Sequence, residues 1–166
     1  MYPLKPITKD AVPKALEKAM RYRMLNEARE AESICLDVLA IDPRHQEALV
    51  TLILALTDQF KRGLGSTLDE ARALLSRIEG EYERAYFGGI VIERAAKAKV
   101  DQGGPGVGPV VHAWLVEAMA SFERAARLRP AGNDDAILRW NTCARILNGH
   151  GEFAPAPPET QPDFLE

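Results

Sequence analysis

Residues 30–43, EAESICLDVLAIDP, decide the fold because their spacing returns twice along the chain. Residues 117–130, EAMASFERAARLRP, repeat the Glu-Ala pair, the apolar positions and the closing proline at the same intervals. Residues 70–80, EARALLSRIEG, give a partial third copy that stops at a glycine. The alanines of the three copies are 40 and 47 residues apart. This spacing indicates a helical unit of about 34 residues with extra residues in each interval.

Helical periodicity dominates the rest of the sequence as well. Apolar residues recur three and four positions apart, and no segment shows sustained alternation of apolar and polar residues between turn signals. We therefore expect an all-α fold. Its seven predicted helices span about residues 10–26, 27–41, 45–61, 67–80, 81–100, 110–128 and 134–148. In the last of these we expect a buried stripe that includes Trp140 and Cys143.

Several short motifs set the expected helix boundaries. Pro43 ends the second helix, because the residue before a proline is pushed out of the helical region. Thr67 and Glu70 have the spacing of a capping box, which predicts that the fourth helix begins at Thr67. Residues 101–109, DQGGPGVGP, are expected to form a loop without helix. The glycine pair 88–89 inside the fifth helix predicts a close approach to a neighbouring helix.

The repeated pattern resembles the tetratricopeptide repeat (TPR), a helix-turn-helix unit with small residues where its helices cross and a proline after its second helix. The first repeat matches best, through Ala19, Tyr22, Ala31, Val38 and Pro43. The resemblance covers residues 11 to 148. It implies antiparallel helix pairs stacked as a short solenoid of about three repeats plus a C-terminal capping helix. The first halves of the later repeats are degenerate, so other helical-repeat folds stay open.

The predicted domain organisation has three parts. Residues 1–9 form an N-terminal extension, residues 10–149 form the TPR-like domain, and residues 150–166 form an acidic, proline-rich tail without lysine or arginine. The composition of the tail predicts disorder.

Composition excludes several classes of protein. The chain is 46% hydrophobic and 27% charged, with 21 basic and 24 acidic residues and a net charge of -3. These values argue against a wholly disordered chain and against a polycation for nucleic acid. The N-terminal segment lacks the apolar stretch of a secretory signal, and no apolar run reaches the length of a membrane span. We expect a cytoplasmic protein that binds neither nucleic acid nor membranes.

No catalytic or metal-binding set stands out. Cys35 and Cys143 are too few for a disulfide framework, and His45, His112 and His150 lie in separate segments without ligands at metal-binding spacing. The sequence thus predicts no cofactor, no metal and no enzymatic activity. An alternative, a small helical enzyme, would place its site near His112 and the 101–109 loop.

The resemblance to TPR proteins implies a protein-interaction adaptor or scaffold that holds a peptide or protein segment on its concave face. By register, the first helix of each pair lines that face and also carries Thr57, Asp58 and Glu93. We hypothesise that Arg94, Arg139 and Arg145 contribute to an acidic-peptide site. The candidate partner-binding residues are Met20, Arg23, Tyr86, Arg94, Arg139, Asn141 and Arg145.

A second hypothesis is structural self-assembly. The ends of a solenoid expose apolar surface, and Tyr2, Leu4 or residues 163–165 could dock on a neighbouring copy to form a homo-oligomer.

Overall fold

The computed structural model describes residues 2–156, and within them the protein is all-α, with no strand. A short 3₁₀ turn, Lys9–Ala11, precedes the first helix. Seven α-helices follow: α1 Val12–Met24, α2 Ala28–Ile41, α3 Gln46–Asp58, α4 Leu64–Leu75, α5 Glu81–Gln102, α6 Val107–Leu128 and α7 Asp135–Gly149. The predicted all-α class and the seven predicted helices are confirmed.

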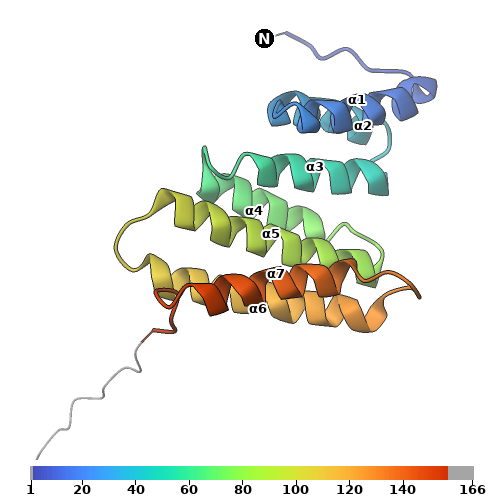
Figure 1. Cartoon of the computed structure of the whole chain (residues 1–166). Helices are drawn as coiled ribbons and strands as arrows, with labels where there is room; N and C mark the ends of the chain where they lie inside the picture. The colour runs from blue at the N-terminus through green and yellow to red at the C-terminus, as the bar shows by residue number, and fades with distance from the viewer. Residues whose placement is uncertain (1, 157–166) are drawn as a thin grey trace, which may run out of the picture.

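Neighbouring helices in the chain pack against each other along the molecule (Figure 1). Each connection is short, so successive helices run antiparallel. The odd-numbered helices also contact one another in the order α1, α3, α5, α7. This packing of adjacent helices fits a helical repeat and brings side chains from the four odd-numbered helices onto one face.

Two kinds of predicted helix end are confirmed. Asn26 has a φ of 61°, a left-handed backbone conformation that ends α1. Asp42 and Arg129, each followed by a proline, are both extended and end α2 and α6. Helices α2 and α6 therefore end at the residue before a proline, because that residue disfavours the helical backbone conformation.

The predicted capping box at Thr67 is wrong. Helix α4 begins three residues earlier, at Leu64, and Leu64 is buried. Thr67 lies inside the first turns, where its hydroxyl donates a hydrogen bond to the carbonyl oxygen of Gly63. Helix α4 starts before the polar capping pair because burial of the Leu64 side chain stabilises the additional turn.

The predicted loop at 101–109 is largely helical. Helix α5 continues to Gln102 and α6 begins at Val107, so the connection is reduced to residues 103–106. Pro109 lies in the first turn of α6, where the missing amide proton costs no helical hydrogen bond. Gly103, Gly104 and Gly106 have positive φ angles, which explains the glycines of the turn itself.

The repeated alanines mark the core. Ala31, Ala71 and Ala118 are all fully buried, as a position at a close helix crossing requires. Gly89 has the same role between α5 and α6, because a Cβ atom there would lie 2.5 Å from the ring of Phe122. The predicted close approach is therefore confirmed at Gly89 but not at Gly88, where the nearest atom, on Leu75, would be 3.9 Å away.

Helix α7 closes the described part of the fold. Just before its start, the side-chain oxygen of Asn133 accepts a hydrogen bond from the amide of Asp135 at 3.0 Å, while the N-cap residue, Asp134, makes no side-chain capping bond. Cys143 is buried, but Trp140, which we expected in the same buried stripe, is 37% exposed. The difference arises because α7 packs on α6 and α5 only, so its other side remains open.

The first residues of the predicted tail pack on the fold. Phe153 is partly buried against the core, and the carbonyl oxygen of Glu152 lies where a side chain on Gly108 would stand. The tail therefore begins with a turn held against the start of α6. The expected disorder of residues 157–166 lies outside the described residues.

Among residues 2–156, none of the helices combines the length and the apolar character that crossing a lipid bilayer would need.

Candidate functional site

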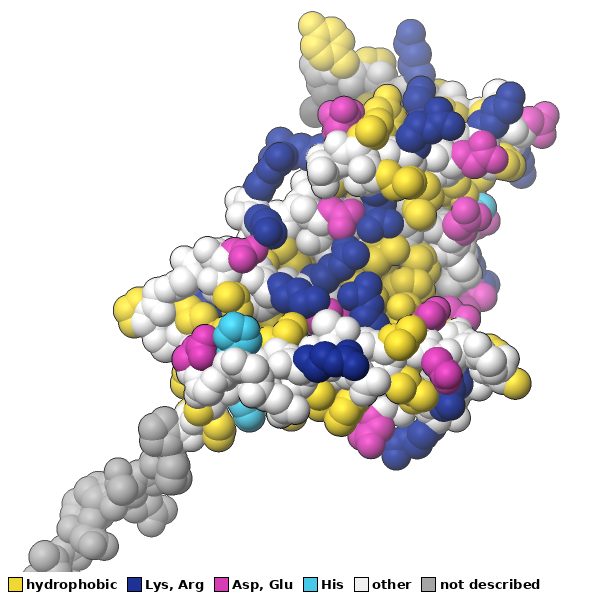
Figure 2. All heavy atoms as spheres, viewed as in Figure 1, with side chains coloured by type: hydrophobic (Ala, Val, Ile, Leu, Met, Phe, Trp, Pro, Cys, Tyr) yellow, Lys and Arg dark blue, Asp and Glu magenta, His cyan; other side chains and the backbone are white. Residues whose placement is uncertain are grey.

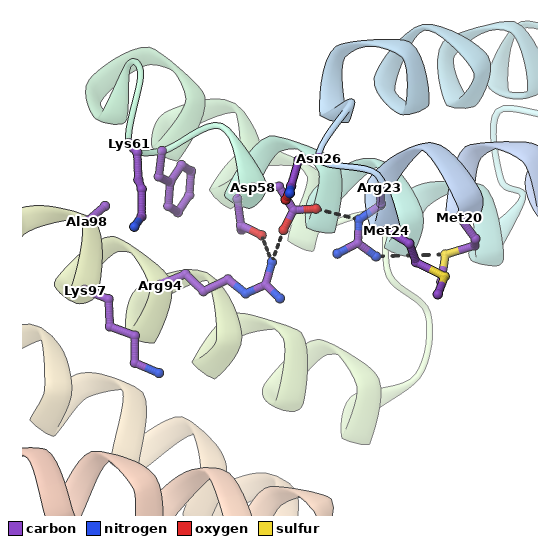
Figure 3. A pocket seen from close by; sticks show the side chains of 11 residues that line it. Met20, Arg23, Met24, Asn26, Asp58, Lys61, Arg94, Lys97 and Ala98 are labelled. Carbon is purple, nitrogen blue, oxygen red and sulfur yellow. Dashed lines mark hydrogen bonds and ion pairs between the residues drawn. The ribbon is translucent and has the colours of Figure 1, made fainter. Parts of the chain in front are cut away.

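A cleft of about 390 Å³ opens where α1, α3 and α5 meet (Figure 3). Its walls come from three segments that are far apart in sequence, and the odd-numbered helices place them together. The lining residues are Met20, Arg23, Met24, Asn26, Thr57, Asp58, Phe60, Lys61, Arg94, Lys97 and Ala98. The cleft thus combines four cationic side chains, one carboxylate and two methionines.

Asp58 organises the floor of the cleft. Its carboxylate accepts a hydrogen bond from Arg23 Nε at 2.8 Å and another from Arg94 Nη1 at 2.6 Å. Arg94 Nη1 also donates to the hydroxyl of Thr57 at 2.7 Å. We call these four residues the Asp58 cluster. It fixes two guanidinium groups from different helices against one anion, so one positive charge is left over.

The Asp58 cluster keeps hydrogen-bonding capacity in reserve. A guanidinium carries five N–H donors in a rigid plane. Within residues 2–156, Nε and Nη2 of Arg94 and Nη2 of Arg23 make no hydrogen bond. The close-up shows these side chains converging on the cleft (Figure 3). Two oriented guanidinium groups with unused donors suit a second carboxylate brought by a ligand.

A second cation pair surrounds Glu93, one residue before Arg94 on α5. The carboxylate of Glu93 is completely buried and accepts from Lys97 Nζ at 2.5 Å. Arg139 of α7 contributes Nη1 at 3.3 Å from both carboxylate oxygens. We call Glu93, Lys97 and Arg139 the Glu93 cluster. It joins α7 to α5 and again leaves one positive charge in excess.

Methionines give the cleft an apolar wall. Met24 is 83% exposed and Met20 is 41% exposed, although both are large apolar side chains. The sulfur of Met20 lies 3.9 Å from Arg23 Nη1 and 3.8 Å from the hydroxyl of Thr51. Methionine side chains adapt to varied apolar partners. The wall is therefore suited to an apolar residue adjacent to an acidic one.

The charge of this face differs from that of the whole chain. Figure 2 shows lysine and arginine side chains gathered around the hollow of the face formed by the odd-numbered helices. The chain as a whole carries a net charge of -3, yet the cleft is lined by four cations and one carboxylate. With Glu93 and Asp101, which pair with Lys97 and Lys61 beside the cleft, the local excess is one positive charge. A local excess of one sign attracts ligands of the opposite sign.

Neither cysteine provides a nucleophile for this face. Burial raises the pKa of Cys35 to about 12, and burial together with the negative charge of Glu93 raises the pKa of Cys143 to about 12. Both thiols therefore stay protonated at neutral pH. In the described part of the chain, no three histidine, cysteine or acidic side chains are arranged to hold a metal ion.

The structure brings some of the sequence-predicted site residues together and separates others. Met20, Arg23 and Arg94 line the cleft, and Arg139 lies beside it in the Glu93 cluster. Tyr86 instead stacks on aromatic neighbours, with its ring centroid 5.8 Å from that of Tyr82. Asn141 and Arg145 lie on α7 and do not line the cleft. Of the three arginines in the acidic-peptide hypothesis, the structure brings Arg94 and Arg139 into this region.

Sequence reasoning missed two cations of the cleft. Lys97 lies four residues after Glu93, a spacing that places the two side chains on one helix face. The sequence alone could therefore have indicated this ion pair. Lys61 lies beyond the end of α3 and forms an ion pair with Asp101 at 2.8 Å. No local pattern connects those two residues, because only the stacking of α3 on α5 brings them together.

Comparison with protein-family models, with curated proteins and with solved structures gives no match to this chain.

Proposed function

We propose that this protein is a non-enzymatic interaction module of the TPR type, an adaptor that binds an extended protein segment in the cleft between α1, α3 and α5. The observation that carries the proposal is the Asp58 cluster, in which two oriented arginines face an open cleft beside exposed methionines. The three buried repeat alanines and the order of the odd-numbered helices support the TPR assignment. We place the protein in the cytoplasm.

The chemistry of the cleft defines the proposed partner as a segment that carries acidic and apolar residues side by side. Carboxylates would bind the unused donors of Arg23 and Arg94, where Arg–carboxylate contacts can be bidentate. An apolar side chain would cover Met20 and Met24 and remove their surface from water. A segment with only one of these features would use half of the cleft.

Selection from a library of displayed random peptides, with the full chain as bait, tests this proposal. We expect enrichment of peptides with adjacent acidic and apolar residues. Arg94→Glu should lower the affinity of a selected peptide at least ~30-fold, the size of a strong interface residue. Selection of basic peptides, or binding that Arg94→Glu leaves unchanged, would contradict the proposal.

The matched control is Arg124→Glu. Arg124 lines a different depression, together with Arg84 and Arg127, so this variant makes the same charge change outside the cleft. We expect Arg124→Glu to change the affinity less than threefold. Circular dichroism melting curves of both variants show whether the fold is retained. Loss of binding in Arg124→Glu alone would place the site in the other depression.

Self-assembly is a second candidate function, favoured by exposed apolar side chains near the ends of the chain. Tyr2 and Leu4 are almost fully exposed, and Leu138 of α7 is also exposed. Light scattering over a range of protein concentrations tests it. A mass that rises with concentration, and that falls after Tyr2→Ser and Leu4→Ser, would support self-assembly over the open adaptor.

A further inference from the structure

We infer that the cleft is a docking site for the chain's own acidic segment, residues 159–166 (ETQPDFLE), bound within the same molecule. The inference rests on the proposed function and names one occupant of the same cleft. It assigns to the segment a regulatory role, because a partner would have to displace it. Charge, apolar character and position within the chain support this occupant independently.

Charge complementarity is the first argument. The segment carries Glu159, Asp163 and Glu166 and has no lysine or arginine. The cleft has the opposite composition, with one carboxylate, Asp58, among four lining cations. Two of these cations, Lys61 and Lys97, also form ion pairs with Asp101 and Glu93 beside the cleft, so the excess is one positive charge. Asp58 already orients Arg23 and Arg94, so a carboxylate from the segment would meet donors that are held in place.

The apolar residues of the segment are the second argument. Phe164 and Leu165 lie directly between Asp163 and Glu166 in the sequence. The cleft presents its exposed methionine wall, Met20 and Met24, beside its arginines. The alternation of acidic and apolar groups in the segment therefore matches the two surfaces of the cleft.

The position of the segment in the chain is the third argument. The backbone at Glu152 lies against Gly108, in the first turn of α6, and a connection of only four residues separates α6 from the end of α5. Gln102 and Lys97, five residues apart on α5, are separated by about 7.5 Å along the helix axis. In Figure 1 the C-terminal ends of α3, α5 and α7 lie at the same end of the molecule.

The C-terminal residues are long enough to reach the cleft of their own molecule. The ten residues 157–166 can span up to ~33 Å when extended. The path from α7 past α5 and α3 to α1 covers three helix spacings, about 24–30 Å in all. A short tether raises the effective concentration of the segment to the millimolar range. Even weak contacts would then keep the cleft occupied in a large fraction of molecules.

A spin label on Thr160→Cys in the full chain tests this inference, and the variant keeps every carboxylate of the segment. The two native thiols are buried, with pKa values raised to about 12, so the label reacts at the new cysteine. We expect paramagnetic broadening of the methyl signals of Met20 and Met24 but not of Met119 on α6. Unbroadened Met20 and Met24 signals would overturn the inference.

Two further measurements locate the contact. Dilution of labelled protein with unlabelled chains should leave the broadening in labelled molecules unchanged, because the contact is intramolecular. Broadening transferred to the unlabelled molecules would instead show exchange between copies and would overturn the inference. Arg94→Glu in the labelled chain should abolish the broadening, and broadening that persists would place the segment outside the cleft.

A variant with a neutralised segment separates this inference from the proposed function. Glu159→Gln, Asp163→Asn and Glu166→Gln together should raise the affinity of the full chain for a selected acidic peptide about tenfold. An unchanged affinity that still depends on Arg94 would refute docking of the segment and leave the proposed function standing. Absence of any selected peptide that depends on Arg94 would refute the proposed function itself.

Discussion

Two carboxylates on the face of the odd-numbered helices have the same charge arrangement but different surroundings. Each forms ion pairs with two cations. Asp58 pairs with Arg23 and Arg94. Glu93 pairs with Lys97 and Arg139. The side chain of Asp58 is 26% exposed, whereas that of Glu93 is completely buried. Water can therefore replace a lost partner of Asp58 but not of Glu93.

This difference separates a structural role from a binding role. Breaking an ion pair on one side leaves a charge behind, and the cost depends on whether that charge is solvated. The Glu93 cluster joins α5 to α7 and should contribute to stability. The Asp58 cluster lies in the cleft and should contribute little to stability but strongly to ligand binding.

The largest expected effect is a loss of stability when Glu93 loses both cations. Lys97→Met with Arg139→Met replaces both cations by shorter, unbranched apolar side chains and leaves a buried carboxylate without a counter-charge. We expect the free energy of unfolding to fall by about 3 kcal/mol or more. Chemical denaturation followed by circular dichroism measures this change.

Addition of Glu93→Met to that variant provides the control. Replacement of a complete buried ionic cluster by apolar side chains is often neutral, so the triple variant should recover most of the lost stability. A double variant that loses less than 1 kcal/mol would show that Lys97 and Arg139 do not neutralise Glu93 in the folded protein.

The next effect is a change in thiol accessibility that distinguishes the two clusters. Cys143 lies on α7 near the Glu93 cluster, and Cys35 on α2 lies near Arg23. Both are fully buried. In the Lys97→Met, Arg139→Met variant, loosening of α7 should speed the modification of Cys143 more than tenfold, while Cys35 changes little. Mass spectrometry after brief alkylation at pH 8 measures both rates, and equal acceleration of the two thiols would indicate global unfolding instead.

The smallest effect is expected from Asp58→Asn. The amide oxygen of an asparagine can still accept a hydrogen bond from Arg23, whose side chain is 12% exposed. Arg94, 27% exposed, keeps its hydrogen bond to Thr57. The free energy of unfolding should therefore fall by less than about 1 kcal/mol. A loss as large as that of the Lys97→Met, Arg139→Met variant, measured under the same conditions, would remove the distinction between the two clusters.

Helix periodicity predicted much of this fold because burial follows local spacing. The prolines at 43 and 130 end α2 and α6 as predicted, and the alanines of the three repeats are all buried. The errors occur where packing decides. Burial of Leu64 starts α4 before the capping pair at Thr67, and Trp140 remains partly exposed because α7 packs on one side only.

The sequence predicted which helix face carries the candidate-site residues, but not which of these residues form ion pairs. The register of the TPR-like repeat placed Arg23, Asp58 and Arg94 on one face. Nothing local indicated that Arg23 and Arg94, 71 residues apart in the sequence, share the carboxylate of Asp58. Tyr86 shows the opposite error, because its face was predicted but its ring packs with Tyr82, Phe87 and Phe122.

We propose above that the cleft between α1, α3 and α5 receives the partner segment. The most direct measurement is a titration of protein labelled at its methionine methyl groups with a selected acidic and apolar peptide. We predict saturable shifts of the Met20 and Met24 signals, while the signal of Met119 on α6 stays in place. Saturation by the peptide without shifts of the Met20 and Met24 signals would show that the peptide binds outside the cleft.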